Sequence, residues 1–73
     1  MFRIGIVGAG KLSQVHLRHL ARIPDVSVTV FDRNLDRSAE VALAHNTQVA
    51  ASFDELLDKS DAIDIITPNF VHA

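Results

Sequence analysis

The hydrophobic residues of this 73-residue chain change their spacing several times between its two ends. Residues 2–7 form a short apolar run that ends at Gly8, which predicts a strand buried on both faces. From Lys11 the apolar positions recur at steps of three and four, which is typical of a helix. This helix is expected to reach Ile23, because Pro24 lacks the amide that an inner helical turn needs. Its expected inner face consists of Leu12, Val15, His16, His19, Leu20 and Ile23.

Residues 26–31 are rich in β-branched side chains and predict a second strand, which Asp32 closes. A second helix is expected over residues 35–44. Asn34 suits its N-cap because the amide oxygen can accept an early helical N–H, and Asn46 suits a left-handed residue after its end. The expected inner face of this helix consists of Leu35, Ala39, Ala42 and Leu43.

Three shorter elements follow: a third strand at residues 47–51, a helix at 53–59 and a fourth strand at 62–66. Ser52 and Glu55 stand at the spacing of a capping box, which marks the start of that helix. The last four residues of the chain predict the first turn of another helix. The regular alternation of strands and helices indicates an α/β fold with a parallel sheet and right-handed crossovers.

Composition restricts the function classes. Seven basic and nine acidic residues give a net charge of −2, which argues against nucleic-acid and anionic-membrane surfaces. The chain has no cysteine, so disulfide and thiolate chemistry are excluded, and no apolar run approaches the roughly 20 residues of a membrane span. The opening residues lack the layout of a signal peptide. We therefore expect at most one small cytoplasmic domain, or part of one.

The segment GAGKLS at residues 8–13 lies where the first strand turns into the first helix. Gly8 permits a tight turn, and Gly10 lets a diphosphate approach the backbone, where the free amides of the helix hold its charge. Ser13 replaces the third glycine of the dinucleotide-binding pattern and is small enough for close packing. Lys11 is interpreted either as a phosphate contact or as a solvated lysine.

Asp32 adds a second element to this pattern, because it lies about 24 positions after Gly8, near the roughly 20 expected for an acid that binds an adenosine ribose. Its carboxylate would accept hydrogen bonds from the ribose hydroxyls and repel a 2′-phosphate, which favours NAD over NADP. Arg33 could instead pair with that phosphate, stack on the adenine or be a solvated arginine.

Two segments resemble one family. Residues 5–16 (GIVGAGKLSQVH) resemble the opening of the glucose-fructose oxidoreductase/inositol dehydrogenase/rhizopine-catabolism family (Gfo/Idh/MocA), and residues 67–73 (TPNFVHA) resemble its T-P-N-x-x-H-A signature. The resemblance covers the whole chain. The chain departs from the family pattern at Ser13 and at Asn46, where many members have glycine.

The resemblance implies a partial Rossmann fold with about four strands in the order 3-2-1-4 and helices on both faces. Residues 1–73 would be the N-terminal part of an NAD(P)-binding domain. A C-terminal substrate domain, which usually mediates homo-oligomerisation, is absent from this sequence. The implied reaction is hydride transfer between NAD(P) and a sugar, cyclitol or related carbinol, assisted by a lysine in a later E-K-P motif. We therefore expect cofactor-binding but no catalytic residues here.

The resemblance also assigns candidate cofactor contacts residue by residue. The pyrophosphate loop would comprise Gly8, Gly10, Lys11, Leu12 and Ser13. Asp32 and Arg33 would bind the adenosine end. The nicotinamide half would be lined by Thr67, Pro68, Asn69 and His72. These segments should meet at the carboxyl edge of the sheet, where the strand order reverses.

The other histidines carry less information. His16 and His19 have a spacing compatible with a metal site, but no third ligand is apparent, and we interpret them as packing residues on the inner or flanking face of the helix. His45 is interpreted as a surface residue at a helix end, where positive charge suits the helix dipole. No metal is expected.

Two other interpretations stay open. The chain could be a non-catalytic half-domain that binds a ligand or associates with itself through the bare edge of the fourth strand. It could also be a methyltransferase, which places glycines and an acid similarly, although the segment at residues 67–72 argues against that class.

Overall fold

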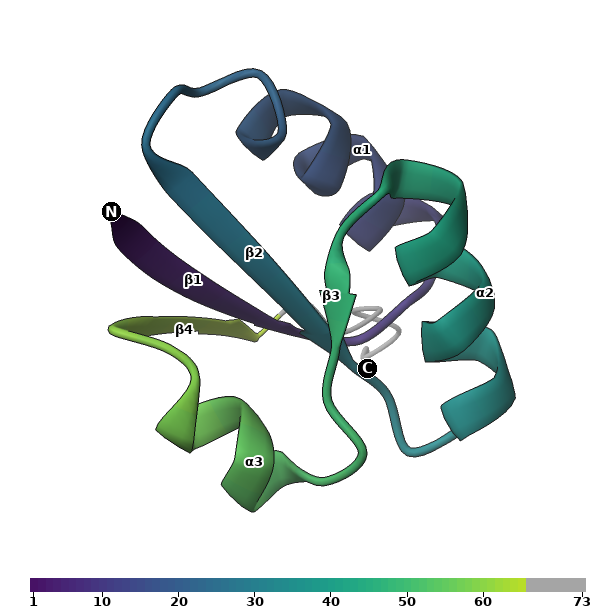
Figure 1. Ribbon diagram of the computed structural model, residues 1–73. Helices are drawn as coiled ribbons and strands as arrows, with labels where there is room; N and C mark the ends of the chain where they lie inside the picture. Colours follow the sequence, from purple (N-terminus) through teal and green to yellow (C-terminus); the bar gives the residue numbers. More distant parts are fainter. Residues whose placement is uncertain (66–73) are drawn as a thin grey trace, which may run out of the picture.

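The computed structural model describes residues 1–65, which form one parallel sheet and the helices around it (Figure 1). The strands are β1 (Phe2–Val7), β2 (Val26–Phe31), β3 (Gln48–Val49) and β4 (Ala62–Ile65), and the helices are α1 (Lys11–Leu20), α2 (Leu35–His45) and α3 (Phe53–Asp58). The sheet order is β3-β2-β1-β4, and every pair is parallel. The predicted fold class and strand order are confirmed.

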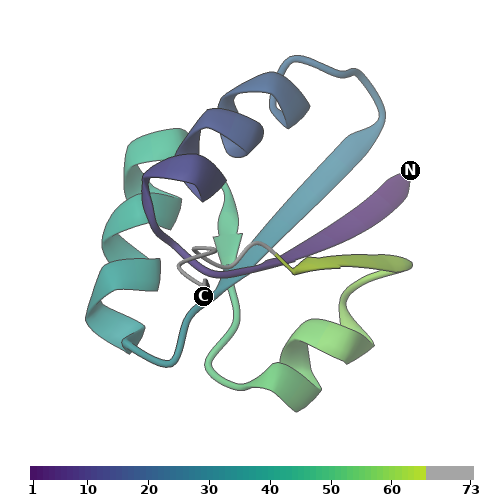
Figure 2. The ribbon, with the colours of Figure 1, turned by 180° about the vertical axis from the view of Figure 1, so that it is seen from behind.

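The helices divide between the two faces of the sheet. Figures 1 and 2 show α1 and α2 together on one face and α3 on the other. The core lies between the sheet and the first pair of helices. It consists of Ile6, Ala9, Leu17, Val28, Val30 and Val41. Between residues 1 and 65, no helix is long and apolar enough to cross a membrane.

On the opposite face, α3 and β4 come very close to β1 at Gly5. A Cβ added to Gly5 would lie 2.8 Å from Ile63 Cδ1 and 2.9 Å from Leu56 Cγ, and it would also strike Ser60 Oγ. Such distances are too short for ordinary van der Waals contact, so only a glycine allows this approach.

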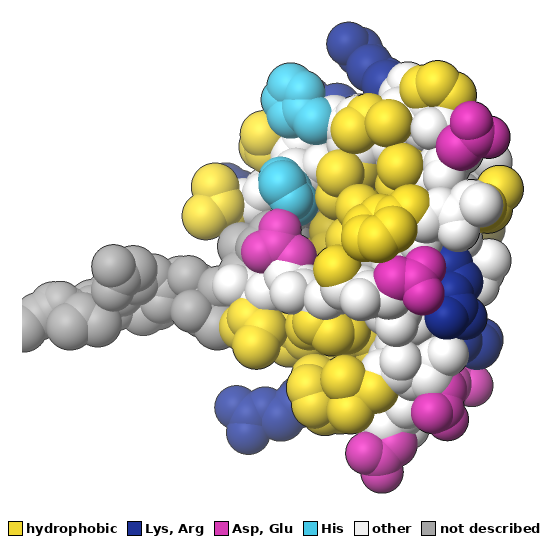
Figure 3. Space-filling view, turned by 90° about the vertical axis from the view of Figure 1, so that its left-hand side faces the viewer, with side chains coloured by type: hydrophobic (Ala, Val, Ile, Leu, Met, Phe, Trp, Pro, Cys, Tyr) yellow, Lys and Arg dark blue, Asp and Glu magenta, His cyan; other side chains and the backbone are white. Residues whose placement is uncertain are grey.

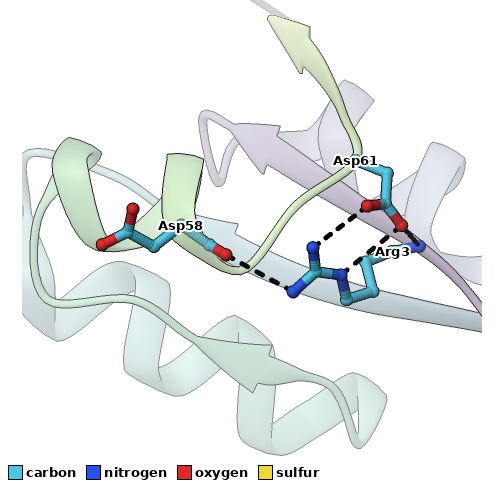
Figure 4. Close-up of polar contacts among 3 residues, drawn as sticks. All are labelled: Arg3, Asp58 and Asp61. Carbon is cyan, nitrogen blue, oxygen red and sulfur yellow. Dashed lines mark hydrogen bonds and ion pairs between the residues drawn. The ribbon is translucent and has the colours of Figure 1, made fainter.

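The beginning of β4 is tied to the beginning of β1 by a cluster of polar contacts (Figure 4). The Arg3 amide donates to Asp61 Oδ2 at 2.9 Å, and Arg3 Nη2 donates to Asp61 Oδ1 at 3.0 Å. In return the Asp61 amide donates to the Arg3 carbonyl at 2.7 Å, and Arg3 Nη1 reaches the Asp58 carbonyl at 3.4 Å. These hydrogen bonds from Arg3 hold the pKa of the Asp61 carboxyl below its ordinary value of 3.8.

The first helix ends earlier than expected, at Leu20 instead of Ile23. Beyond it the amides of Arg22 and Ile23 donate to carbonyls three residues back, which tightens the chain into a turn. Pro24 disfavours helical geometry in the residue before it, and Asp25 follows with a φ of 64°. The proline therefore ends the helix before the chain reaches it.

The inner faces expected for the first two helices are largely wrong. In α1 the buried residues are Ser13 and Leu17, whereas Leu12 and Val15 are 66% and 45% exposed. Ile23 is also half exposed, His19 is exposed, and Leu20 is partly buried. Beside Leu17, α1 therefore turns the small Ser13 inward.

In α2 the buried residues are Ser38, Val41 and Ala42, so only Ala42 was expected correctly. Leu35 and Leu43 are 49% and 86% exposed. Ser38 is tolerated inside because its hydroxyl donates to the Leu35 carbonyl at 3.1 Å.

Several element boundaries also differ from expectation. The third strand covers two of the five expected residues, because the Thr47 amide completes the end of α2 and the Ala51 amide donates to the Glu55 carboxylate. The helix over 53–59 ends one residue early, at Asp58. The first strand is buried only toward its end, at Gly5 and Ile6. The last expected residue of β4 and the final helical turn lie outside the described residues.

Candidate functional site

The turn after β1 has a conformation that requires glycine. Gly8 has a φ of 107°, where side-chain-bearing residues are strained. Its amide donates to the Phe31 carbonyl at 2.8 Å, so the turn begins while the chain is still held against β2. The following residue, Ala9, is buried in the core at 1% exposure. The turn is therefore fixed to the sheet before α1 begins.

The amino end of α1 differs from those of the other two helices. Asn34 and Ser52 cap α2 and α3, accepting hydrogen bonds from the amides of Arg37 and Glu55. The N-cap of α1 is Gly10, which has no side chain to offer, and the first turn of α1 contains no acidic residue. The first amides of a helix have no partner within it, so with no side-chain cap among residues 1–65 those of α1 can bind an anion.

Gly10 leaves open space in front of these amides. Its φ of −80° and ψ of −174° are accessible to any residue, and a Cβ added there would meet no atom within 4 Å. Within residues 1–65, the ligand-free fold therefore gives no reason for a glycine at this position. A group approaching the amides would occupy this open space.

The remaining residues of the segment have different surroundings. Ser13 is 1% exposed and packs where α1 crosses the sheet, in keeping with its expected role as a small residue. Lys11 and Leu12 are exposed at the start of the helix. Lys11 is therefore free to contact a bound anion, whereas the Leu12 side chain points away from the core.

Asp32 lies at the end of β2 and connects two turns. Its Oδ2 accepts a hydrogen bond from the Ala9 amide at 2.8 Å, and its Oδ1 accepts one from the Asn34 amide at 2.9 Å. The structure thus brings the predicted acid to the glycine turn across 23 positions of sequence. Arg33, the next residue, is exposed. The contact with Ala9 was not predicted, because it depends on how the two turns approach one another in space.

The second motif lies outside the described residues. Thr67, Pro68, Asn69 and His72 all fall beyond Ile65, so their positions are not described here. The strand that leads to them is in place, because Ile65 of β4 pairs with Val7 of β1. The described chain therefore ends at the sheet edge that carries the Gly8 turn.

The two histidines of α1 have different surroundings. His19 is exposed, whereas His16 lies on the flank of the helix, as one of the predicted placements had it, and its Nε2 is 2.7 Å from Asp64 Oδ2 of β4, with both side chains about half exposed. In the sequence, the hint of this pair is the acidic Asp64 within an apolar strand. His45 ends α2, as expected, and its Nε2 lies 3.5 Å from Gln14 Oε1. No group of three metal-ligating side chains occurs within the described part of the chain.

Comparison with known proteins identifies relatives of the whole segment. Residues 2–73 match the model of the Gfo/Idh/MocA oxidoreductase family, described as having an NAD-binding Rossmann fold. UDP-N-acetylglucosamine 3-dehydrogenase of Acidithiobacillus ferrooxidans is 39% identical over 70 residues, which cover 96% of this chain and 22% of that protein. Its crystal structure gives a TM-score of 0.78 over 90% of this chain and 21% of that one.

Two further solved structures have the same fold. A myo-inositol dehydrogenase of Corynebacterium glutamicum is 30% identical, with a TM-score of 0.76 over 93% of this chain and 21% of that one. GenD2 from gentamicin A biosynthesis, solved with NAD, is 27% identical, with a TM-score of 0.80 over 92% of this chain and 20% of that one. The chain thus spans about a fifth of the length of these relatives. The matches favour the interpretation as part of an oxidoreductase over that of an isolated non-catalytic module.

Proposed function

The chain belongs to the Gfo/Idh/MocA oxidoreductase family, and from this membership we propose that it binds a nicotinamide dinucleotide across the carboxyl edge of its sheet. The observation that carries the proposal is the uncapped start of α1, which faces open space at Gly10 and lies next to the Asp32 carboxylate. Open sheets of this kind bind ligands at such an edge, where the strand order reverses.

The diphosphate of the dinucleotide is proposed to bind at the start of α1. The free amides following Gly10 suit its two negative charges, and the positive end of the helix dipole favours them further. Lys11 is exposed beside this position and can add a cation. Ser13 contributes through packing, since its side chain is buried against the sheet.

Asp32 is proposed to accept hydrogen bonds from the adenosine ribose. Each carboxylate oxygen offers two acceptor positions, so both can bind a hydroxyl while still accepting a backbone amide. Its negative charge disfavours a 2′-phosphate, and we therefore propose NAD as the preferred cofactor. Arg33 is exposed beside it and would contact either the adenine or, in NADP, the additional phosphate.

The nicotinamide half is proposed to lie beyond β4, against Thr67, Pro68, Asn69 and His72. Support comes from the family signature in this segment and from the pairing of Ile65 with Val7, which brings the chain to the correct edge. When bound, the dinucleotide would supply or accept hydride. In a longer chain of this family, a C-terminal domain would present a sugar, cyclitol or related carbinol and the proton-transferring lysine, with residues 1–73 as the N-terminal part of the cofactor domain.

Self-association forms a second part of the proposal. β4 is an edge strand of the described sheet, and exposed apolar residues lie beside it on α1. Unpaired strand edges and exposed apolar faces both favour contacts with a second copy. We therefore propose a homo-oligomer.

Calorimetric titration of the 73-residue chain with NAD, NADP and S-adenosylmethionine tests the cofactor assignment. We expect one NAD to bind per chain, NADP to bind more weakly, and S-adenosylmethionine to give no binding heat. Binding of S-adenosylmethionine without NAD would instead support a methyltransferase. A crystal soaked with NAD that held the ligand away from α1 would overturn the site.

A further inference from the structure

We propose that Asp32 is a positioning residue for the diphosphate as well as a ligand of the ribose, because its carboxylate holds the glycine turn in its binding conformation. Diphosphate affinity would then depend on an acid that does not touch the diphosphate. The inference rests on the proposed function for the identity of the ligand. The contacts that carry it belong to the ligand-free protein.

Two successive amides fasten the turn to the end of β2. The Gly8 amide donates to the Phe31 carbonyl at 2.8 Å, and the Ala9 amide donates to Asp32 Oδ2, also at 2.8 Å. The first bond continues the backbone ladder between the two strands. The second bond lies outside that ladder, because its acceptor is the Asp32 side chain and not a backbone carbonyl. It holds the chain after Gly8, where φ is 107° and the backbone direction changes.

The carboxylate is itself held in one orientation. While Oδ2 accepts from Ala9, Oδ1 accepts from the Asn34 amide at 2.9 Å, so both oxygens are bound to backbone. Asn34 in turn caps α2 through the Arg37 amide at 3.2 Å. Asp32 therefore links the turn before α1 to the turn before α2, and the start of α1 takes its place relative to β2 through this side chain.

The arrangement also determines which amides remain for a ligand. Ala9 is 1% exposed and its amide is already used, so it cannot bind a phosphate in this conformation. Among residues 1–65, no side chain caps the amides after Gly10, and the space beside Gly10 is open. If the Asp32 carboxylate were removed, the buried Ala9 amide would lose its acceptor, and the turn would rotate to find another. After such a rotation the amides that follow Gly10 would no longer point toward one bound diphosphate.

Amide hydrogen exchange on the ligand-free 73-residue chain tests the positioning contact without any nucleotide. In Asp32→Ala we expect exchange at Ala9 to accelerate about tenfold or more, with a similar change at Asn34, while the core amides of β2 keep their rates. Asp32→Asn retains one oxygen and should accelerate one of the two amides. Glu40→Gln, which removes an equal charge from an exposed position on α2, should change neither. An unchanged rate at Ala9 in Asp32→Ala and Asp32→Asn would overturn the proposal.

Binding of inorganic pyrophosphate tests the consequence, because this ligand has no ribose. Removing a nearby negative charge should by itself strengthen anion binding. The positioning role predicts the opposite sign, with pyrophosphate affinity several-fold weaker in Asp32→Ala than in Glu40→Gln, and weaker in Asp32→Asn to the extent that exchange at Ala9 accelerates there. Equal or stronger pyrophosphate binding, with weaker NAD binding, would leave Asp32 as a ribose ligand only and overturn the inference. If the parent chain bound neither NAD nor pyrophosphate, the proposed function would fail, and the exchange rates would still decide the positioning role.

Discussion

The three glycines of this chain serve three different physical purposes. Gly8 supplies a backbone conformation, with a φ of 107°. Gly5 leaves space, because residues of α3 and β4 occupy the position that a side chain would take. Gly10 has an ordinary conformation, and no atom of the described part of the chain would meet a Cβ there, so neither reason applies to it. The purpose proposed for Gly10 is to leave room for a ligand.

Substitution of Gly10 by alanine should separate binding from folding. The added Cβ would meet no atom of the described residues, so we expect only a small loss of thermal stability, of about 1 kcal/mol or less, because alanine is a poorer N-cap than glycine. The same methyl group would stand where the diphosphate approaches, and NAD affinity should fall about tenfold or more, or about 1.4 kcal/mol. Melting curves and calorimetric titration measure the two effects. Undiminished NAD affinity in Gly10→Ala would place the diphosphate elsewhere.

Substitution of Gly5 by alanine should have the opposite profile. The new methyl group would overlap Leu56 and Ile63, and overpacking of this kind costs about 1–3 kcal/mol. Urea denaturation should show the loss in the free energy of unfolding. The NAD affinity of the remaining folded protein should be close to that of the parent, because Gly5 lies on the α3 face. Equal stability of Gly5→Ala and the parent would show that α3 does not pack as closely as described.

At the scale of the elements, one side-chain pair ties the start of β4 to β1, since Arg3 of β1 contacts Asp61, directly before β4. Because the hydrogen bonds from Arg3 lower the pKa of Asp61 in the folded state, the ionised carboxylate is favoured by folding. Its contribution to stability is therefore complete above the ordinary pKa of 3.8 and is lost as the pH falls through the lower folded value.

Asp61→Asn should reduce the dependence of the free energy of unfolding on pH in the acid range. We expect the parent to lose stability more steeply than the variant as the pH falls below about 4, since only the parent must protonate a carboxylate that folding has stabilised. Urea denaturation at a series of pH values gives the two slopes. Glu40→Gln is the control for loss of one acid, and it should retain the parental slope. Parallel curves for Asp61→Asn and the parent would show that the pair with Arg3 is not maintained in solution.

The sequence allowed the order of the elements to be predicted but not the orientation of the helices. Strand limits at Phe2, Val7, Val26 and Phe31 followed from apolar runs bounded by turns, and the left-handed Asn46 was expected. The faces of α1 and α2 were misjudged in two ways. The pattern was placed on the wrong apolar residues, since Leu17 and Val41 are the buried ones, and it counted serine as polar. Ser13 and Ser38 are buried because their size permits close packing, which the periodicity of one helix does not reveal.

The site was predictable to a similar degree. The uncapped glycine and the acid at the end of β2 could be assigned from spacing. The hydrogen bond between Asp32 and Ala9 could not, because it depends on the relative heights at which β1 and β2 end. The pair formed by His16 and Asp64 was missed for the same reason, since it joins a helix to a strand more than forty positions away.

For the molecule as a whole, α1 and β4 form one exposed side of the described residues. Leu12 and Val15 are exposed on α1, the same helix contacts β4 through His16 and Asp64, and β4 is an edge strand of the described sheet. Figure 3 shows hydrophobic and histidine side chains gathered on the side of the molecule where β1 and β4 lie. A second copy of the chain would bury part of this surface.

Val15→Lys should therefore weaken self-association. Sedimentation velocity over a range of concentrations should show the parent forming a larger species that the variant forms less readily, because a charge would replace an apolar contact. Leu43→Lys provides a matched control, since Leu43 is 86% exposed on α2 and its loss should leave the association unchanged. A parent that sediments as a monomer at every concentration would contradict the proposed homo-oligomer.

The missing cap on α1 has a consequence for any attempt to make this protein more robust. Asparagine, aspartate or serine at position 10 would cover the exposed helical amides and raise stability by a few tenths of a kcal/mol over glycine. The same side chain would occupy the amides that we assign to the dinucleotide. Selection for heat resistance alone would thus drive residue 10 toward a protein that folds better and has lost its ligand, whereas selection in the presence of NAD should preserve Gly10.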